Sequence, residues 1–476
     1  MIDVPADKNL GTALVSRQLY EQQIDVTFER SFVRLDEAEA LALIDQISGE
    51  LIEIVRDAVG KNTITDIESD YLLCLRNCWR WPHLRLLWKV HKKNIDTRLI
   101  SSGTKWITCP LDVFVSRALQ PICESLPTVA KDTSAVIDLL TSVPPRPNLN
   151  IASFDVEKLY PTLDTGLVLL VVRNHLVRFY TCSPVPLWGF LVEFILQLLH
   201  LVLKGQIVTF KPRCKPNAHM QFWRQVLGIA TGLSCGVQIA NITLFELDLH
   251  VADTLGWRLV AYKRFVDDAL CVHDNSLDIN TILLAFNSWH ASITVTHDSA
   301  ERDGLSTSFL DLDIKILNCR IHFSTFRKPA NTYAYTPFNS AHPVSCFKGI
   351  VATELFRLLR TNETCKDYEF QCGFFLQKLR YRGYPAKFCS NIFKRFPWTS
   401  KNAILNRASS IPTEKQQRKI IGFRIRYCFG IDTVGITSVL HDCSDILPND
   451  FLCKVKFITS YSIALNNFRS RYNRFL

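Results

Sequence analysis

The chain contains 476 residues, of which 47% are hydrophobic and 21% are charged, with a formal net charge of +10. This composition excludes a disordered chain, and the length suffices for two or three subdomains with their own cores. The polar start MIDVPADKN excludes a secretory signal, and 16 scattered cysteines without a CxxC pair indicate reduced thiols.

The most apolar stretch, residues 187–203, is short for a membrane span and is interrupted by Glu193, Gln197 and His200. We therefore predict a buried helix at this stretch and no membrane partner. The expected location is the nucleus, with the cytoplasm as the alternative.

Positive charge is concentrated in the last third of the chain. From residue 321 onward there are 24 Lys and Arg against 9 Asp and Glu, a net charge of +15, whereas the preceding residues carry −5. Aromatic residues alternate with cations in residues 380–388, 393–398, 415–427 and 468–475. Such strips suit the backbone and bases of a nucleic acid, although charged helix faces are usually only solvated.

Two elements are predicted near the N-terminus. Residues 36–59 have helical periodicity with acidic residues in the first turn. Residues 86–103 predict a strand, a turn at 92–94 and a return strand. This hairpin carries the cations Lys89, His91, Lys92, Lys93 and Arg98. They form either a solvated basic loop or a phosphate clamp.

Residues 150–163, NIASFDVEKLYPTL, predict a strand that runs into Asp155, followed by a turn and the start of a helix. An aspartate at the end of an apolar strand lies at the edge of a sheet, so Asp155 is a candidate carboxylate ligand. A helix N-cap is the competing interpretation. Tyr160 follows five residues later, and its ring can lie over the same pocket.

Three glycines, Gly228, Gly232 and Gly236, precede a long apolar helix that ends near residue 248. Glycines at such a place allow the backbone to approach a ligand closely, or they form a small-residue packing face. The pattern is neither a Walker A loop nor a GxGxxG motif.

Residues 258–273, RLVAYKRFVDDALCVH, predict two apolar strands joined by a tight turn that holds Asp267 and Asp268. Adjacent carboxylates repel each other, and a site that keeps both ionised needs cations. The competing interpretation is an ordinary turn, in which Lys263 and Arg264 neutralise the pair.

Downstream, residues 279–296 predict a helix and a strand, and residues 309–317 alternate as a strand that pairs with residues 320–329. Asp155 lies far from Asp267 in the sequence, so only a sheet can bring them together. Three carboxylates around one gap match a two-metal site for displacement at phosphorus. Oxygen ligands favour two Mg²⁺ ions, with Mn²⁺ as a substitute.

The ordered motifs resemble those of the reverse transcriptases of Penelope-like retroelements. Three palm motifs of these enzymes have counterparts in FDVEKLYPTL, GIATGLSCGVQIANITLFELD and RFVDDAL. The fingers motifs resemble ADKN and WKVHKK…RLIS. The segments that follow the palm motifs resemble FLDLDI, FRKPANTYAYTPFNSAHP and LRYRGYP. The match extends from about residue 6 to about residue 390. The chain is most similar to an endonuclease-lacking or truncated member, because no GIY…YIG pair is present.

This resemblance implies an α+β right-hand polymerase. It would have fingers at residues 1–110, a palm of antiparallel sheet packed on helices at 111–325, and a mostly helical thumb with a basic extension at 326–476. Asp155, Asp267 and Asp268 would bind the metals. The implied nucleotide-binding residues are Lys89, Arg98, Tyr160 and Gly232, with Tyr160 as the gate against ribose. The implied primer grip is Phe309, Leu310 and Asp311.

We therefore predict an RNA-directed DNA polymerase, a nucleotidyltransferase that extends a primer 3′-hydroxyl. Its partners would be an RNA template, a DNA primer and dNTPs. The alternatives are a catalytically decayed copy that only binds RNA, and a telomerase-like or maturase-like relative.

Overall fold

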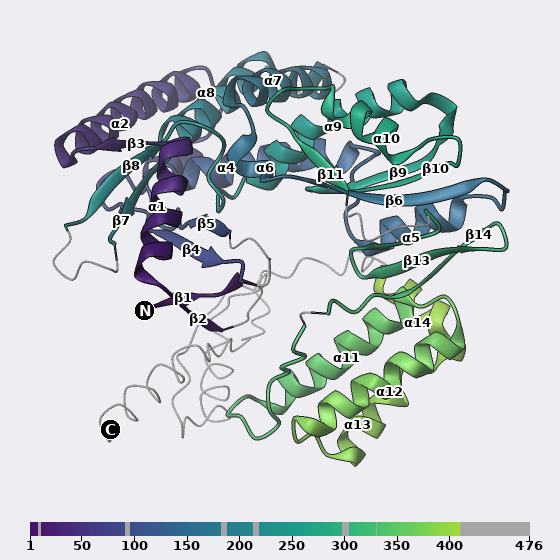
Figure 1. Cartoon of the computed structure of the whole chain (residues 1–476). Coiled ribbons are helices and arrows are strands. Elements are labelled where there is room, and N and C mark those ends of the chain that lie inside the picture. The colour runs from purple at the N-terminus through teal and green to yellow at the C-terminus, as the bar shows by residue number, and fades with distance from the viewer. Residues whose placement is uncertain are drawn as a thin grey trace, which may run out of the picture. The chain divides into compact units, whose positions relative to one another are not determined.

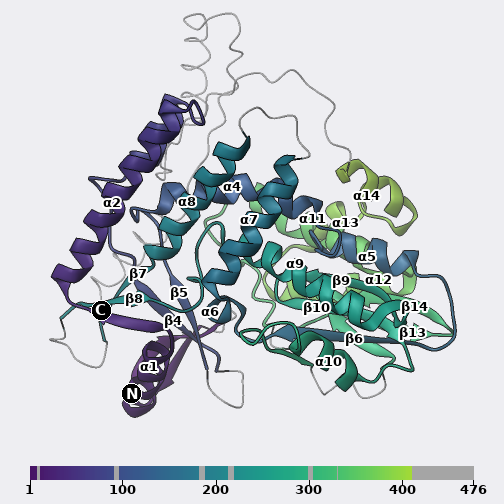
Figure 2. The ribbon, with the colours of Figure 1, turned by 90° about the horizontal axis from the view of Figure 1, so that it is seen from above.

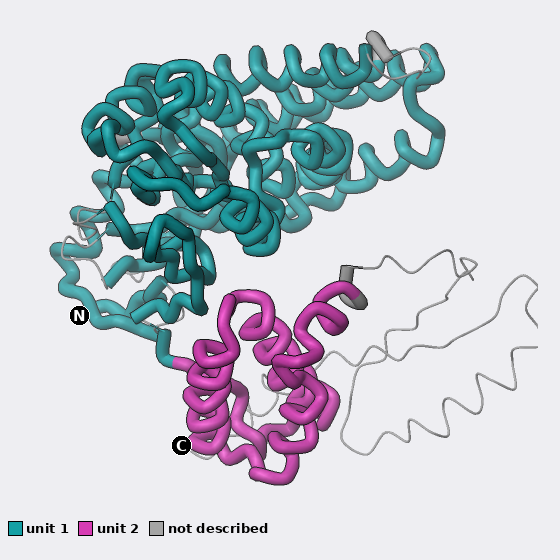
Figure 3. Tube along the Cα trace, turned by 90° about the vertical axis from the view of Figure 1, so that its right-hand side faces the viewer, with its two compact units in different colours: residues 1–332 teal, residues 333–476 magenta. Residues whose placement is uncertain are grey.

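The computed structural model describes residues 1–7, 11–90, 96–181, 188–212, 219–297, 304–329 and 331–409. The chain divides into two compact units, unit 1 (Met1–Thr332) and unit 2 (Tyr333–Leu476) (Figure 3). This division lies close to the limit predicted between palm and thumb at residues 325 and 326. The basic segments 415–427 and 468–475, and Lys8 and Asn9 of the ADKN motif, lie outside the described residues.

A four-stranded antiparallel sheet forms the centre of unit 1. Its strand order is β11-β6-β10-β9. The bounds are Leu149–Val156 for β6, Leu259–Phe265 for β9, Asp268–Asp274 for β10 and Val295–His297 for β11. The predicted hairpin and the predicted strand into Asp155 are therefore both present, and β6 pairs directly with β10.

Both faces of this sheet are covered, because its strands alternate apolar residues toward two separate cores. Ala152, Phe154 and Cys271 belong to one core, whereas Ile151 and Val272 belong to the other. The first core also contains side chains of α4 (Cys109–Ser125), α7 (Thr165–Thr181), α8 (Trp188–Lys204), α9 (Gly236–Leu255) and α10 (Ile279–Asn287) (Figures 1 and 2). The second face packs on α5 (Thr133–Ser142) and on the sheet of β12 (Ser306–Phe309), β13 (Leu312–Leu317) and β14 (Arg320–Thr325).

The predicted buried helix is α8, and most of its side chains from Val192 onward are buried. No helix in the described ranges is long and apolar enough to cross a lipid bilayer. The predicted helix at residues 36–59 is α2 (Glu37–Gly60), which begins with a capping box between Asp36 and Glu39.

The N-terminal part of unit 1 contains three small antiparallel sheets. Their strands are β1 (Ile2–Pro5) with β2 (Thr12–Val15), β4 (Leu84–Trp88) with β5 (Thr97–Ser101), and β3 (Phe32–Leu35) with β8 (Gln221–Gln225) and β7 (Ile207–Phe210). Helices α1 (Arg17–Ser31) and α3 (Asp66–Leu73), and the short α6 (Leu159–Thr162) and η2 (Gly256–Arg258), complete the unit. Strands β7 and β8, predicted within the palm, thus pair with a strand predicted within the fingers.

Unit 2 is helical in its described part. It contains α11 (Val344–Thr361), α12 (Cys365–Tyr381), α13 (Ala386–Phe393), η3 (Trp398–Ser400) and α14 (Lys401–Ser409). Its core is rich in aromatic side chains, including Phe347, Phe375 and Tyr384. Gly383 takes a φ of +83° in the turn between α12 and α13, a conformation that glycine adopts without a steric penalty.

One predicted strand is wrong in detail. Residues 309–317 form the end of β12, a turn at Leu310 and Asp311, and then β13. Leu310 has a φ of +53°, which is unusual for a residue with a branched side chain. The turn contains no Gly, Asn or Pro. Its one turn-forming residue, Asp311, stands between leucines, where an alternating strand would also place a polar residue, so the sequence does not separate the two strands.

Candidate active site

Three aspartates lie together at one end of the central sheet. Asp268, the first residue of β10, is the direct register partner of Asp155 on β6. Directly opposed residues of an antiparallel pair project from the same face of the sheet, with Cβ atoms about 4.5–5.5 Å apart. Asp267 precedes Asp268 in the turn, and its carbonyl accepts a hydrogen bond from Val156 N (3.0 Å). The sheet therefore brings the three predicted carboxylates to one place.

The pKa of Asp268 is shifted by its surroundings, which include the other two aspartates. Partial burial, and then the charges of Asp267 and Asp155, raise the pKa of Asp268 to about 7, while Lys328 acts in the opposite direction. Lys328 follows β14 in the sequence, and sequence analysis assigned it no role. Burial, together with the two neighbouring carboxylates, thus favours a bound proton on Asp268 near neutral pH.

The donor chemistry of these residues suits a hard divalent cation, because carboxylate oxygens are the ligands that Mg²⁺ takes. In the part of the chain that the structure describes, however, no group of three or more His, Cys, Asp or Glu side chains is gathered closely enough to hold a metal ion. The three aspartates are therefore neighbours without forming a closed ligand set.

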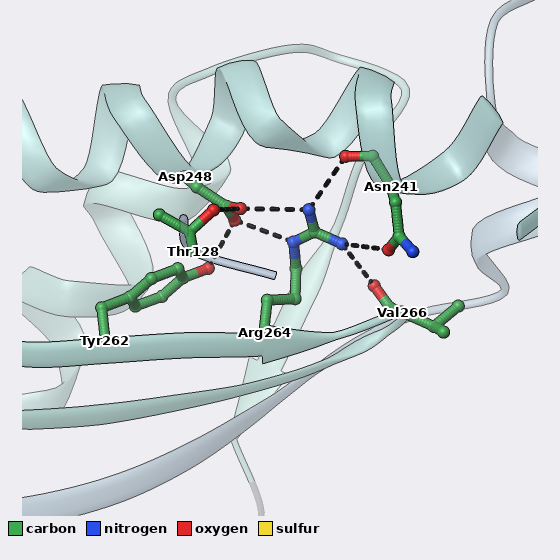
Figure 4. A network of polar contacts seen from close by, with 6 residues as sticks. All are labelled: Thr128, Asn241, Asp248, Tyr262, Arg264 and Val266. Atoms are coloured by element: carbon green, nitrogen blue, oxygen red, sulfur yellow. Dashed lines mark hydrogen bonds and ion pairs between the residues drawn. The ribbon is translucent and has the colours of Figure 1, made fainter. Parts of the chain in front are cut away.

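A buried ion pair fixes the turn that carries the aspartates (Figure 4). Arg264 on β9 and Asp248 on α9 are both 0% exposed and form two bonds, Nε to Oδ1 (2.8 Å) and Nη2 to Oδ2 (3.0 Å). Nη1 of Arg264 donates to the carbonyl of Val266 (2.9 Å). Val266 has a φ of +57°, an unfavourable conformation for a β-branched residue, so this contact helps to hold the turn.

Further hydrogen bonds complete the network around Asp248. Its carboxylate accepts from the hydroxyls of Thr128 (2.6 Å) and Tyr262 (2.7 Å), and Arg264 also donates to the side chain of Asn241 (3.0 Å). The interpretation in which Lys263 and Arg264 neutralise the two aspartates is wrong. Arg264 is bound to Asp248, and Lys263 donates to the carbonyl of Pro127.

Tyr160 lies beside the aspartates. Burial and the nearby charge of Asp267 raise the pKa of its hydroxyl. A Cβ atom at Gly236, the first residue of α9, would lie 3.5 Å from Cε1 of Tyr160, so the ring contacts the start of that helix. The Tyr160 carbonyl accepts a hydrogen bond from Ile229 N (2.8 Å).

The glycine-containing loop before α9 is clamped against the hairpin of β4 and β5. Gly232 has a φ of +129°, and a Cβ atom there would lie 2.2 Å from the carbonyl oxygen of Ser101. Ser101 N donates to the Thr231 carbonyl (2.9 Å). The buried Asp112 accepts from the backbone N–H groups of Ser234 (2.6 Å) and Cys235 (2.9 Å). Gly232 is thus required by close packing, and Asp112, which sequence analysis missed, anchors the loop.

The two predicted phosphate-binding cations are engaged by carboxylates. Nζ of Lys89 lies 3.2 Å from Oδ2 of Asp96, and Nζ of Lys158 lies 3.8 Å from Oδ1 of the same carboxylate. Nη2 of Arg98 lies 3.6 Å from Oδ2 of the buried Asp7. Burial disfavours ionisation of Asp96, but a backbone hydrogen bond and the two lysines outweigh it and lower its pKa. Residues 91–95, with three of the predicted cations, lie outside the described residues.

The predicted primer-grip residues surround the turn between β12 and β13. Phe309 is 2% exposed and belongs to the core beneath the central sheet. Leu310 and Asp311 are partly exposed, and the Asp311 carbonyl accepts from Phe326 N (2.7 Å). Leu310 and Asp311 are therefore accessible at this turn, whereas Phe309 is buried in the core.

The family described as the animal helix-turn-helix domain matches residues 334–394, within unit 2. No curated protein sequence matches the chain. The solved telomerase of Candida albicans, in complex with a TWJ fragment of telomeric RNA, is similar with a TM-score of 0.51 and 12% identity, covering 85% of this chain and 69% of that chain.

Two other solved structures are less similar. The apo telomerase of Candida tropicalis has a TM-score of 0.44 and 11% identity, covering 87% of this chain and 67% of that chain. The Sicinivirus 3Dpol RNA-dependent RNA polymerase has a TM-score of 0.40 and 12% identity, covering 71% of this chain and 70% of that chain. The first similarity confirms the predicted right-hand polymerase fold of mixed helix and sheet. Identities this low concern the fold alone.

The raised pKa of Asp268 predicts a pH-dependent stability. Because the folded state binds a proton between pH 3.8 and about 7 that the unfolded state releases, the contribution of this group to folding should decrease as pH rises through that window. Asp268→Asn, which mimics the neutral acid, should remove this decrease. Urea denaturation at pH 5 and pH 8, in buffer that contains a chelator, measures the change in the free energy of unfolding. Asp138→Asn on α5 is the control and should keep the pH dependence of the wild type. Equal pH dependence in Asp268→Asn and the wild type would contradict the assignment.

The ion pair makes a second prediction. Asp248→Asn leaves the buried Arg264 without a compensating charge, so the free energy of unfolding should fall by about 3–5 kcal/mol. Asp253→Asn, at an exposed position of the same helix, should change it by less than about 0.5 kcal/mol. Equilibrium denaturation of both variants tests the difference. Losses of similar size would show that the pair does not hold the hairpin.

Proposed function

We propose that the chain is an RNA-directed DNA polymerase of a Penelope-like retroelement. The observation that carries the proposal is the register pairing of Asp155 with Asp268 beside Asp267, within a fold shared with a telomerase. The order of the palm and fingers motifs along the sequence supports the Penelope-like assignment. The chemistry is transfer of a nucleotide onto a primer 3′-hydroxyl.

In this proposal Asp155, Asp267 and Asp268 hold two Mg²⁺ ions, with Mn²⁺ as a substitute. Bound divalent ions supply charge neutralisation at the triphosphate and activation of the attacking hydroxyl. The protein contributes the placement of the carboxylates, which the Arg264–Asp248 pair restrains through Val266. The raised pKa of Asp268 means that cation binding there competes with a proton near neutral pH.

The pocket for the incoming dNTP is proposed to lie between Tyr160 and the loop at Gly232. Tyr160 is partly buried against Gly236, and we assign its ring the role of excluding a ribose 2′-hydroxyl. Lys89 and Arg98 would exchange their present partners, Asp96 and Asp7, for phosphate oxygens. Leu310 and Asp311 would contact the primer end.

The proposed partners are an RNA template and a DNA primer. The Candida albicans telomerase of similar fold was solved with a fragment of telomeric RNA, which supports RNA as a partner here. The excess of positive charge after residue 321 supports it independently. A separate endonuclease activity is not part of the proposal.

Primer extension tests the activity. With an RNA template, a DNA primer, dNTPs and Mg²⁺, the wild type should incorporate nucleotides, and Asp268→Asn should lower the rate by more than about 100-fold, because loss of even an outer-shell partner of a metal costs 10–100-fold. Asp274→Asn, at the opposite end of β10, is the matched control and should retain activity.

Other outcomes of the same assay separate the alternatives. Absence of incorporation by folded protein that still binds RNA would indicate a decayed copy. A preference for ribonucleotides would indicate an RNA polymerase, and repeated copying of one short template would indicate a telomerase-like enzyme. Full activity of Asp268→Asn would refute the assignment of the carboxylates.

The gate is tested by substitution at Tyr160. Tyr160→Ala should reduce discrimination against ribonucleotides by about 10–100-fold, as expected for removal of a steric contact. Tyr160→Phe should retain discrimination, because the ring rather than the hydroxyl fills the space. The ratio of kcat/KM for dNTP and NTP measures the effect. An unchanged ratio in Tyr160→Ala would refute the gate.

A further inference from the structure

A groove of about 330 Å³ lies on unit 2, between α11 and α13. Its lining combines cations, an amide and aromatic rings. The lining residues are Lys348, Ala352, Phe388, Asn391, Ile392, Arg395 and Phe396. No acidic side chain is among them. The groove is therefore apolar in its walls and cationic at its edge.

The polar side chains of the groove have their bonding capacity available. Lys348, Asn391 and Arg395 are exposed, and within the described ranges their side chains form no hydrogen bond or ion pair. Lys348 comes from α11, Asn391 from α13 and Arg395 from the segment after α13. Two cations and one amide from separate positions thus line the same space without protein partners.

The aromatic residues of the groove are fixed by the core of unit 2. The Phe388 ring packs against Phe338 at a centroid distance of 5.1 Å and against Tyr384 at 6.2 Å. The backbone of Phe396 is held by the Tyr368 hydroxyl, which donates to its carbonyl (2.6 Å). Both residues remain partly exposed. The rings are therefore positioned before any ligand arrives, which lowers the entropic cost of binding.

The surrounding charge selects the kind of ligand. Residues 378–409 contain eight Lys and Arg and no Asp or Glu. Such a field attracts a polyanion, and preformed aromatic surfaces beside cations are the elements that bind unpaired bases. An asparagine side chain can both donate to and accept from the edge of a base.

We infer that this groove binds one unpaired nucleotide of a nucleic-acid strand. The base would stack on Phe388 or Phe396, Asn391 would contact its edge, and Lys348 and Arg395 would contact the flanking phosphates. The inference deepens the proposed function, since it assigns unit 2 a contact with single-stranded template or product. It concerns binding alone and requires no catalysis.

Photo-crosslinking of the full chain tests the location. A single-stranded 15-mer RNA containing 5-iodouridine, and the DNA strand containing 5-iododeoxyuridine, are irradiated with the protein in EDTA without dNTPs. We expect attachment within residues 386–396, at Phe388 or Phe396. The relative yields of the two strands show whether RNA or DNA is preferred. Attachment only outside unit 2 would overturn the inference.

Affinity measurements test the polar contacts. The double variant Lys348→Gln/Arg395→Gln should weaken binding of the 15-mer about 10-fold and reduce the slope of log K against log salt by about 1.4, since each phosphate contact on a single strand contributes about 0.7. Arg56→Gln/Lys366→Gln removes two exposed cations that lie outside the groove and outside residues 378–409, and should leave the slope unchanged. Equal effects of the two double variants would overturn the inference.

Two further comparisons complete the test. A duplex of the same sequence should compete less well than the single strand, and a polyglutamate peptide of equal charge should compete poorly. Effective competition by the peptide would indicate an acidic protein ligand and overturn the inference. Asp268→Asn should bind and crosslink as the wild type does. If the wild-type chain binds at this groove but incorporates no nucleotide in the primer-extension assay, the proposed function is refuted and the binding inference stands.

Discussion

The arrangement of the candidate site depends on one buried ion pair, between Arg264 and Asp248. Neither side chain reaches water, and the desolvation of each charge is compensated only by the other and by the surrounding hydroxyl, amide and carbonyl groups. Because Asp248 belongs to α9 and Arg264 to β9, the pair fixes the distance between helix and hairpin. The same guanidinium holds the Val266 carbonyl, so the position of Asp267 and Asp268 follows from it.

A second set of buried polar contacts restrains the opposite wall of the site. Asp112 accepts two backbone N–H groups at the start of α9, and Gln206 accepts from Ala230 N and donates to the Gly228 carbonyl. These side chains satisfy backbone groups that no strand or helix pairs. The loop that faces Tyr160 is thereby restrained at both ends. In both walls of the candidate site, buried polar groups restrain the position of the backbone.

Much of this architecture is predictable from hydrophobic periodicity. The strand into Asp155, the Asp267–Asp268 hairpin and helix α8 follow from patterns of apolar residues, whose burial dominates local structure. The register that pairs Asp155 with Asp268 cannot be predicted from these patterns, because it depends on contacts between distant segments. The partners of Arg264 and the role of Asp112 are also invisible in the sequence. A lone charged residue carries no signal of its partner, and the competing interpretation of the turn assigned Arg264 to Asp267 and Asp268 instead.

The pairing of β3 with β7 and β8 has a consequence for the synthesis of the chain. The N-terminal core contains Phe28, Phe32 and Trp88 together with Val208 and Phe210. At a translation rate of about 5–20 residues per second, strand β3 waits roughly 10 to 35 s for β7 to emerge from the ribosome. During that interval its apolar side chains and its unpaired edge are exposed to other nascent segments. The N-terminal core can therefore be completed only after β7 and β8 have been synthesised, long after the first strands of unit 1 have been made.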